Sequence, residues 1–274
     1  MLDSRLIDEI QKLTNEIKIE NKIENKEIIR DDVFNILQNL PDCIVLYYPI
    51  DLEADEDGCD GCHVIRCVKG KKKQLVFINT ANTRERQAFS VAHELGHIWE
   101  VDKKIKERIP NLVFDSEDVI NRFAAELLMP EGTFQREAIK KLDELSIEEN
   151  GSRSIRVVDF IKIIVYLMNY FFAPFKAVVL RLDEVGIGDK ATTDLLLKYK
   201  DSEYVKSIIV EEQYTRLGIK TNIKSVSNLA EKINEIEEKH LFSDNKIKVI
   251  RDLFDLSEIK VDAEMKDKLN IKIP

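Results

Sequence analysis

Two histidines that stand four residues apart give the sequence its clearest chemical signal. His93 and His97 belong to the pattern His-Glu-x-x-His, in which Glu94 follows the first histidine. If this segment is helical, the two imidazoles lie one turn apart on one face and can bind the same metal ion. Glu94 then lies beside that face, where its carboxylate reaches a water molecule next to the ion rather than the ion itself. The spacing therefore predicts metal-assisted hydrolysis with Glu94 as general base.

A catalytic zinc ion needs a third protein ligand and an open position. Glu117 is the favoured third ligand, because it lies 20 residues beyond His97 at the start of a second predicted helix that can pack back against the first. Asn121 follows one turn later on the same face and is expected to accept a hydrogen bond from the outer N–H of a histidine ligand. Other carboxylates stay open as alternative third ligands: Glu100, Asp102, Asp115, Asp118 and Glu126.

Two helices are expected to carry these side chains. Apolar residues at helical spacing, from Ala88 to Trp99, indicate a helix over about residues 84–101. A second helix is predicted over residues 116–129, with Asp115 or Ser116 at its start and Pro130 after its end.

Upstream of the motif lie three segments with the length and apolar composition of strands: residues 43–48, 63–68 and 74–79. The last two form a predicted hairpin, and the 74–79 strand is expected to border the substrate cleft and to pair with an extended peptide. The region after about residue 150 is rich in helical patterns. These elements predict an α+β fold, in which a small mixed or antiparallel sheet packs against the active-site helix pair and the C-terminal region is mostly helical.

Three regions are predicted along the chain: an N-terminal helical segment over residues 1–40, a domain over 41–185 that contains the His-Glu-x-x-His pattern, and a helical region of unassigned role over 186–274. The formal net charge of −9 disfavours direct binding to nucleic acid. The N-terminus shows no secretory signal, and the apolar stretch 163–175 is short for a membrane span. A cytoplasmic protein is therefore expected.

Cysteine-based sites are weighed and disfavoured. Cys59, Cys62 and Cys67 lack the second spaced pair that a structural zinc site needs. The Cys59–His63 segment matches a haem-attachment pattern, but that chemistry normally follows export. These cysteines are instead interpreted as ordinary small apolar side chains on a turn and a strand.

Two further features are expected to carry no chemistry. The acidic stretch from Glu53 resembles the start of a calcium-binding loop, but Val64 stands where its final ligand belongs. His63 and His240 are interpreted as structural or solvated, and His240 lies in a charged predicted helix.

Two segments resemble the ImmA/IrrE family of metallopeptidases. The first, from Phe89 to His97, reads FSVAHELGH, and the second, from Glu117 to Pro130, reads EDVINRFAAELLMP. The likeness extends over about residues 41–185. Ile120 departs mildly from the family pattern, which frequently has alanine there, and touches no proposed ligand.

This resemblance implies a gluzincin-like site, in which His93, His97 and Glu117 bind zinc and Glu94 is the general base. It also implies a biological role, because characterised members are cytoplasmic proteases of bacteria or phages that cleave a helix-turn-helix repressor and so release stress-response or mobile-element genes. A protein substrate of this kind is the expected partner. Two alternatives remain: a non-cleaving metal-binding regulator that acts through protein contacts, and a secreted general protease, which the missing signal disfavours.

Overall fold

The structure is a computed structural model that describes residues 3–23, 28–50, 60–68, 70–149, 152–254 and 256. The chain folds into two compact units, Met1–Ile223 and Lys224–Pro274. The region boundaries predicted near residues 40 and 185 stay predictions.

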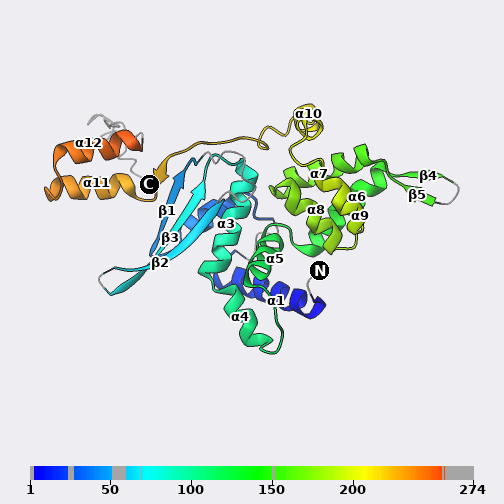
Figure 1. Ribbon diagram of the computed structural model, residues 1–274, viewed down its shortest axis with the longest axis horizontal. Helices are drawn as coiled ribbons and strands as arrows, with labels where there is room; N and C mark the ends of the chain where they lie inside the picture. Colours follow the sequence, from blue (N-terminus) through cyan, green and yellow to red (C-terminus); the bar gives the residue numbers. More distant parts are fainter. Residues whose placement is uncertain are drawn as a thin grey trace, which may run out of the picture. The chain divides into compact units, whose positions relative to one another are not determined.

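A mixed sheet in the first unit supports the segment that carries the motif. Strand β1 (Cys43–Tyr48) runs parallel to β3 (Lys71–Asn79), and β2 (Gly61–Val68) runs antiparallel to β3, which gives the order β2-β3-β1 (Figure 1). Val76 and Ile78 of β3 are buried and alternate along the strand, as expected for a sheet with one face in the core. Together with the helices, this sheet confirms the predicted α+β class.

The motif helix packs on this sheet and ends earlier than its apolar pattern predicts. Helix α3 (Arg84–Ile98) contacts β2 and β3. Glu100 then adopts a left-handed conformation, with φ of 54°, and α4 (Val101–Arg108) begins in a new direction. The predicted continuation to residue 101 is therefore wrong. The turn at Glu100 redirects the chain so that Val101 and Ile105 are buried against α1 (Ser4–Glu20) and α5 (Ser116–Leu128).

The other helices of the first unit pack on the sheet and on one another. Helix α2 (Asp32–Gln38) contacts α3 and β1. Helix α6 (Glu131–Leu145) contacts α7 (Val157–Phe171), which also contacts α8 (Phe175–Glu184) and α10 (Glu203–Glu211), and α8 contacts α9 (Lys190–Leu197). Strands β4 (Ile147–Glu149) and β5 (Ser152–Ser154) form a hairpin (Figure 1). The second unit contains β6 (Ser225–Val226), α11 (Leu229–Glu238) and α12 (Asp244–Leu253). These elements confirm a mostly helical C-terminal region.

Helices α7 and α8 hold the most apolar segment of the chain, and most of their residues are buried. Among the described residues, no single helix has the length and hydropathy of a membrane span. Taken together the two helices reach that length, but they bend by 105° at the break between them.

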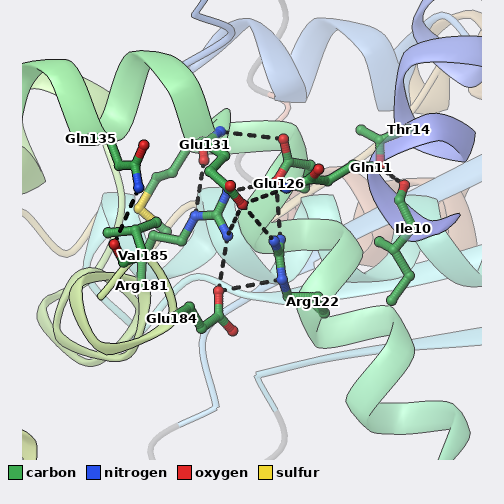
Figure 2. A network of polar contacts seen from close by, with 11 residues as sticks. Ile10, Gln11, Thr14, Arg122, Glu126, Glu131, Gln135, Arg181, Glu184 and Val185 are labelled. Atoms are coloured by element: carbon green, nitrogen blue, oxygen red, sulfur yellow. Dashed lines mark hydrogen bonds and ion pairs between the residues drawn. The ribbon is translucent and has the colours of Figure 1, made fainter. Parts of the chain in front are cut away.

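A buried ion network fixes the C-terminal end of α5 to α6 and α8 (Figure 2). Arg181 and Arg122 are 0% and 2% exposed, and both contact Glu126, at 2.5 Å and 3.0 Å respectively. Glu184 lies 2.9 Å from Arg181 and 3.3 Å from Arg122, and Glu131 lies 3.6 Å from Arg122. Buried guanidinium groups require such partners, because an unpaired buried charge is very costly.

The first turn of α3 is tied to residues 217–223, which are distant in sequence. The backbone N–H of Gly218 donates to the buried carboxylate of Glu85 at 3.2 Å, and the N–H of Arg84 donates to the carbonyl of Ile219 at 2.8 Å. This return segment, residues 217–223, therefore closes the N-terminal end of the motif helix.

Candidate metal centre

Three predicted ligands converge between α3 and α5. The Nε2 atoms of His93 and His97 are 3.1 Å apart, and the Glu117 carboxylate lies 3.2 Å from the first and 3.6 Å from the second. One ligand atom from each residue lies within 4.8 Å of the other two, and this is the one such group of His, Cys, Asp and Glu within the described ranges. The two histidines are partly buried, whereas Glu117 is 62% exposed. The arrangement offers two nitrogens and one carboxylate to a single point.

Close packing of the two helices brings Glu117 to the histidines. A Cβ atom at Gly96 would lie 3.1 Å from side-chain atoms of both Ile120 and Phe123, so the absence of a side chain at Gly96 lets α5 approach α3. At the start of α5, the Asp115 side chain accepts a hydrogen bond from the Glu117 N–H at 2.7 Å. The cap fixes the first turn, from which the Glu117 carboxylate reaches back to α3.

Asn121 contacts the first histidine from the next turn of α5. Its Oδ1 lies 3.0 Å from Nδ1 of His93. An amide oxygen accepts, so Nδ1 of His93 carries the proton and Nε2 presents its lone pair toward His97 and Glu117. Burial and the neighbouring His93 lower the pKa of His97, which favours a neutral ring with a lone pair to donate. Both histidines are therefore suited to bind a metal ion.

Glu94 lies beside the three ligands in a different environment. It is 4% exposed and packs against Gly61, the first residue of β2. Burial, and then the negative charge of Glu117, raise the pKa of Glu94 to about 7. A carboxylate held in this way is suited to accept a proton, and it is separate from the group of potential ligands.

Strand β2 places a third histidine near the site, which the sequence interpretation missed. The ring of His63 lies 6.4 Å from that of His97, centroid to centroid, with 23° between the planes. Its Nε2 lies 2.5 Å from Oε1 of Gln74 on β3. Alternation along β2 places Gly61 and His63 on one face. The sequence predicts the hairpin of β2 and β3, but it does not specify which face of β2 packs against α3.

The predicted substrate-binding edge of the sheet is wrong. Strand β3, which includes the segment 74–79, pairs with β1 on one side and with β2 on the other. The main-chain hydrogen-bonding groups on both sides of β3 are therefore already paired within the sheet. Strand β2 stands at the end of the strand order, so it takes the place that was expected for the 74–79 strand.

The alternative third ligands lie in other settings. Glu126 belongs to the buried ion network, Asp115 caps α5, and Glu100 pairs with Lys103 at 2.6 Å. Asp102 and Asp118 also lie outside the group formed by the two histidines and Glu117.

Among the described residues, no arrangement of side chains supports a cysteine, calcium or His240 site. Cys59 and the acidic stretch from Glu53 lie outside those residues. Cys62 and Cys67 are exposed on β2, and Cys43 is half-buried on β1. His240 is exposed in the turn that follows α11.

The fold and the converging ligands describe a domain of metallopeptidase type. Residues 62–183 match the family model described as the IrrE N-terminal-like domain (Peptidase_M78), which supports membership in the ImmA/IrrE family. Among solved structures, a Mycobacterium tuberculosis transcriptional regulator is similar at 14% identity and a TM-score of 0.40. The match covers 64% of this chain and 46% of the regulator, so this chain spans less than half of the regulator's length. No curated protein matches the chain.

Proposed function

We propose that this chain is a zinc-dependent endopeptidase that cleaves a helix-turn-helix transcriptional repressor in the cytoplasm. The observation that carries the proposal is the convergence of His93, His97 and Glu117 on one point, with Glu94 beside them. Residues of these types at this spacing are those of zinc hydrolases.

The donor atoms fit zinc by type and by separation. Zinc in proteins is bound by histidine nitrogen and carboxylate oxygen at about 2.0–2.2 Å in tetrahedral geometry, which separates its ligand atoms by about 3.3 Å. The three donor separations here are 3.1, 3.2 and 3.6 Å. Three protein ligands leave one position for water or substrate, as catalytic zinc requires.

The chain's own residues supply the remaining chemistry. Zinc bound at this site provides a Lewis acid that acidifies water and polarises the scissile carbonyl. Glu94 accepts the proton of the attacking water and passes it to the leaving amine as the peptide bond breaks. Asn121 holds His93 in the tautomer that keeps Nε2 free of a proton.

An extended substrate is proposed to pair with the outer edge of β2. An edge strand can accept a further strand through its main-chain hydrogen-bonding groups. The side chains of His63 and Ile65 lie along this strand, beginning next to His97. Main-chain pairing of this kind would place a peptide bond beside Glu94.

The choice of a repressor as substrate rests on membership of the ImmA/IrrE family, whose characterised members cleave helix-turn-helix repressors. A net charge of −9 suits a protease whose target, rather than the protease itself, contacts DNA.

Metal analysis and cleavage assays on matched variants test the proposal. Purified wild type should contain zinc and cleave a repressor encoded beside its gene. Glu94→Gln should keep the metal and lose about 10²- to 10⁴-fold in cleavage rate, whereas Glu117→Ala should lose the metal. Glu100→Gln is the control, because Glu100 is an exposed carboxylate outside the ligand group, and it should retain both properties.

Three results would contradict the proposal: wild type without zinc, full zinc retention in Glu117→Ala, or undiminished cleavage by Glu94→Gln. Derepression that persists in Glu94→Gln without cleavage would instead favour the non-cleaving regulator.

A further inference from the structure

A basic patch lies on the outer part of the β2–β3 hairpin, although the chain as a whole is acidic. Arg66 of β2 pairs across the sheet with Lys73 of β3, Cys67 with Lys72, and Val68 with Lys71. These four basic residues lie within a hairpin of a chain whose net charge is −9. We propose that this basic hairpin, defined by Arg66, Lys71 and Lys72, binds an acidic segment of the peptide substrate. The proposal rests on the proposed peptidase function.

Strand β2 connects the candidate metal centre directly to the basic hairpin. Gly61, at its start, packs on Glu94, and His63 lies next to His97. Seven residues separate Gly61 from Val68, and a strand advances about 3.4 Å per residue, so the hairpin end lies about 24 Å away along the strand. A peptide that pairs with the outer edge of β2 would therefore pass from Glu94 to the lysines in one continuous strand.

The charges of the basic hairpin are available to a ligand. Arg66, Lys71 and Lys72 are exposed, and none of them forms an ion pair with an acid in the part of the chain that the structure describes. The two acids that interact with these lysines are already engaged. Asp42 is bound by Lys73, and Glu100 is bound by Lys103 at 2.6 Å.

The same strand also defines which side chains a substrate would present. Val64 and Ile65, between His63 and Arg66, are 42% and 53% exposed and lie on opposite faces of the strand, so apolar side chains on both faces of a substrate strand can pack beside them. The basic residues follow immediately. The substrate class is therefore an extended peptide with apolar residues about three to four positions from the scissile bond and acidic residues about five to seven positions from it.

An acidic peptide fits this surface better than a nucleic acid does. The exposed main chain of an edge strand recognises another peptide backbone, and the hairpin charges then select its side chains. A nucleic acid that extended beyond the hairpin would meet a protein of net charge −9.

Binding to the full-length Glu94→Gln protein tests the assignment without cleavage. The probes are two fluorescein-labelled peptides of about ten residues. They share an apolar half and differ in the other half, which carries four glutamates in one peptide and four glutamines in the other. Fluorescence anisotropy should show the glutamate peptide binding about tenfold more tightly at low salt, with the difference shrinking at high salt.

Reversing the charges of the basic hairpin tests whether it is the surface that binds the glutamate peptide. In Arg66→Glu/Lys71→Glu/Lys72→Glu the preference for the glutamate peptide should disappear, while zinc content and binding of the glutamine peptide stay the same. The matched control is Lys176→Glu/Lys190→Glu/Lys198→Glu, which reverses three exposed lysines on other elements and changes the net charge equally. It should keep the preference. Should the reversed hairpin not fold, the neutral variant Lys71→Gln/Lys72→Gln gives the same comparison with a smaller expected loss.

Equal binding of the two peptides, an equal loss in the control variant, or tighter binding of duplex DNA than of the glutamate peptide would overturn the proposal. A wild-type protein that binds the glutamate peptide at the hairpin but cleaves no peptide would overturn the proposed function and leave the hairpin assignment standing.

Discussion

Gly61 and Glu94 meet where β2 begins, so closely that a Cβ atom on Gly61 would lie 2.9 Å from Oε1 of Glu94. The same atom would lie 3.1 Å from the carbonyl oxygen of Phe77 on the neighbouring strand. A side chain at position 61 has no room on either side unless Glu94 moves. Asp60, the residue before, is held to α3 by Arg86 at 2.8 Å, so β2 itself cannot easily withdraw. The strand therefore helps to define where the proposed general base lies.

The variant Gly61→Ala should lower kcat by about 10- to 100-fold while leaving zinc content unchanged, because it displaces Glu94 but not the three ligands. The measurement is a kcat and KM comparison on one cleaved substrate, with metal analysis of the same preparation. Gly132→Ala is the control, since a Cβ there meets nothing within 4 Å. Unchanged kcat in Gly61→Ala would show that the proposed base tolerates displacement.

Asn121→Ala should weaken zinc binding by about 10- to 100-fold, because His93 loses the acceptor that fixes its tautomer. Titration against a chelator measures the affinity directly. Asn121→Asp keeps an acceptor oxygen and should recover most of the lost affinity. If both variants bind zinc as wild type does, the contact with His93 has no role in metal binding.

Glu126→Gln should reduce the free energy of unfolding by about 3–5 kcal/mol, because Arg122 and Arg181 are both buried and share this carboxylate. Denaturant unfolding measures the loss. Glu203→Gln removes an exposed carboxylate that pairs with Lys206 and should change stability by less than about 1 kcal/mol. Equal effects of the two substitutions would mean that Glu184 and Glu131 suffice for the arginines.

Glu85 should make stability depend on pH. Burial raises the pKa of Glu85, opposed by hydrogen bonds from its own backbone N–H, Thr83 and Gly218. Because the folded pKa lies above the unfolded value, the protonated form is stabilised by folding. That contribution is complete below the unfolded pKa and is lost as the pH rises through the folded pKa.

Glu85→Gln keeps an oxygen for the Gly218 N–H and removes the titration. Relative to wild type, the variant should gain stability between about pH 4 and pH 7, measured as the urea midpoint of metal-free protein. Glu107→Gln, at an exposed position on α4, serves as the control and should show no such trend. A constant difference between Glu85→Gln and wild type across this range would contradict the prediction.

Local patterns explain how much of the fold could be predicted. The strand segments and the helices that hold His93 and Glu117 follow from period and capping residues, and these signals are contained within each element. The turn at Glu100 could not be predicted, because its left-handed conformation is set by the burial of Val101 and Ile105 against distant helices.

Only part of the candidate site could be predicted from the sequence, for the same reason. Helix geometry places His93, Glu94 and His97 together on one helix, and Glu117 and Asn121 one turn apart on the next, so the sequence suffices to predict each of these two groups. The sequence predicts the hairpin of β2 and β3, and the structure confirms it. The sequence does not predict that this hairpin packs on α3 and so brings Gly61 and His63 to the site, nor that β1 pairs in parallel with β3 and leaves β2 at the end of the strand order. These contacts join segments through the tertiary fold and leave no mark in the spacing of residues.

The hydrogen bond between Glu85 and Gly218 can form only late in the synthesis of the chain. These residues are 133 positions apart, and a ribosome adds about 5–20 residues per second, so Gly218 is made roughly 7 to 27 seconds after Glu85. Until then the first turn of α3 lacks its closing segment, although all three side chains of the candidate metal centre have already been made. The nascent chain thus carries all three candidate ligands before the segment that bonds to the first turn of α3 has been made.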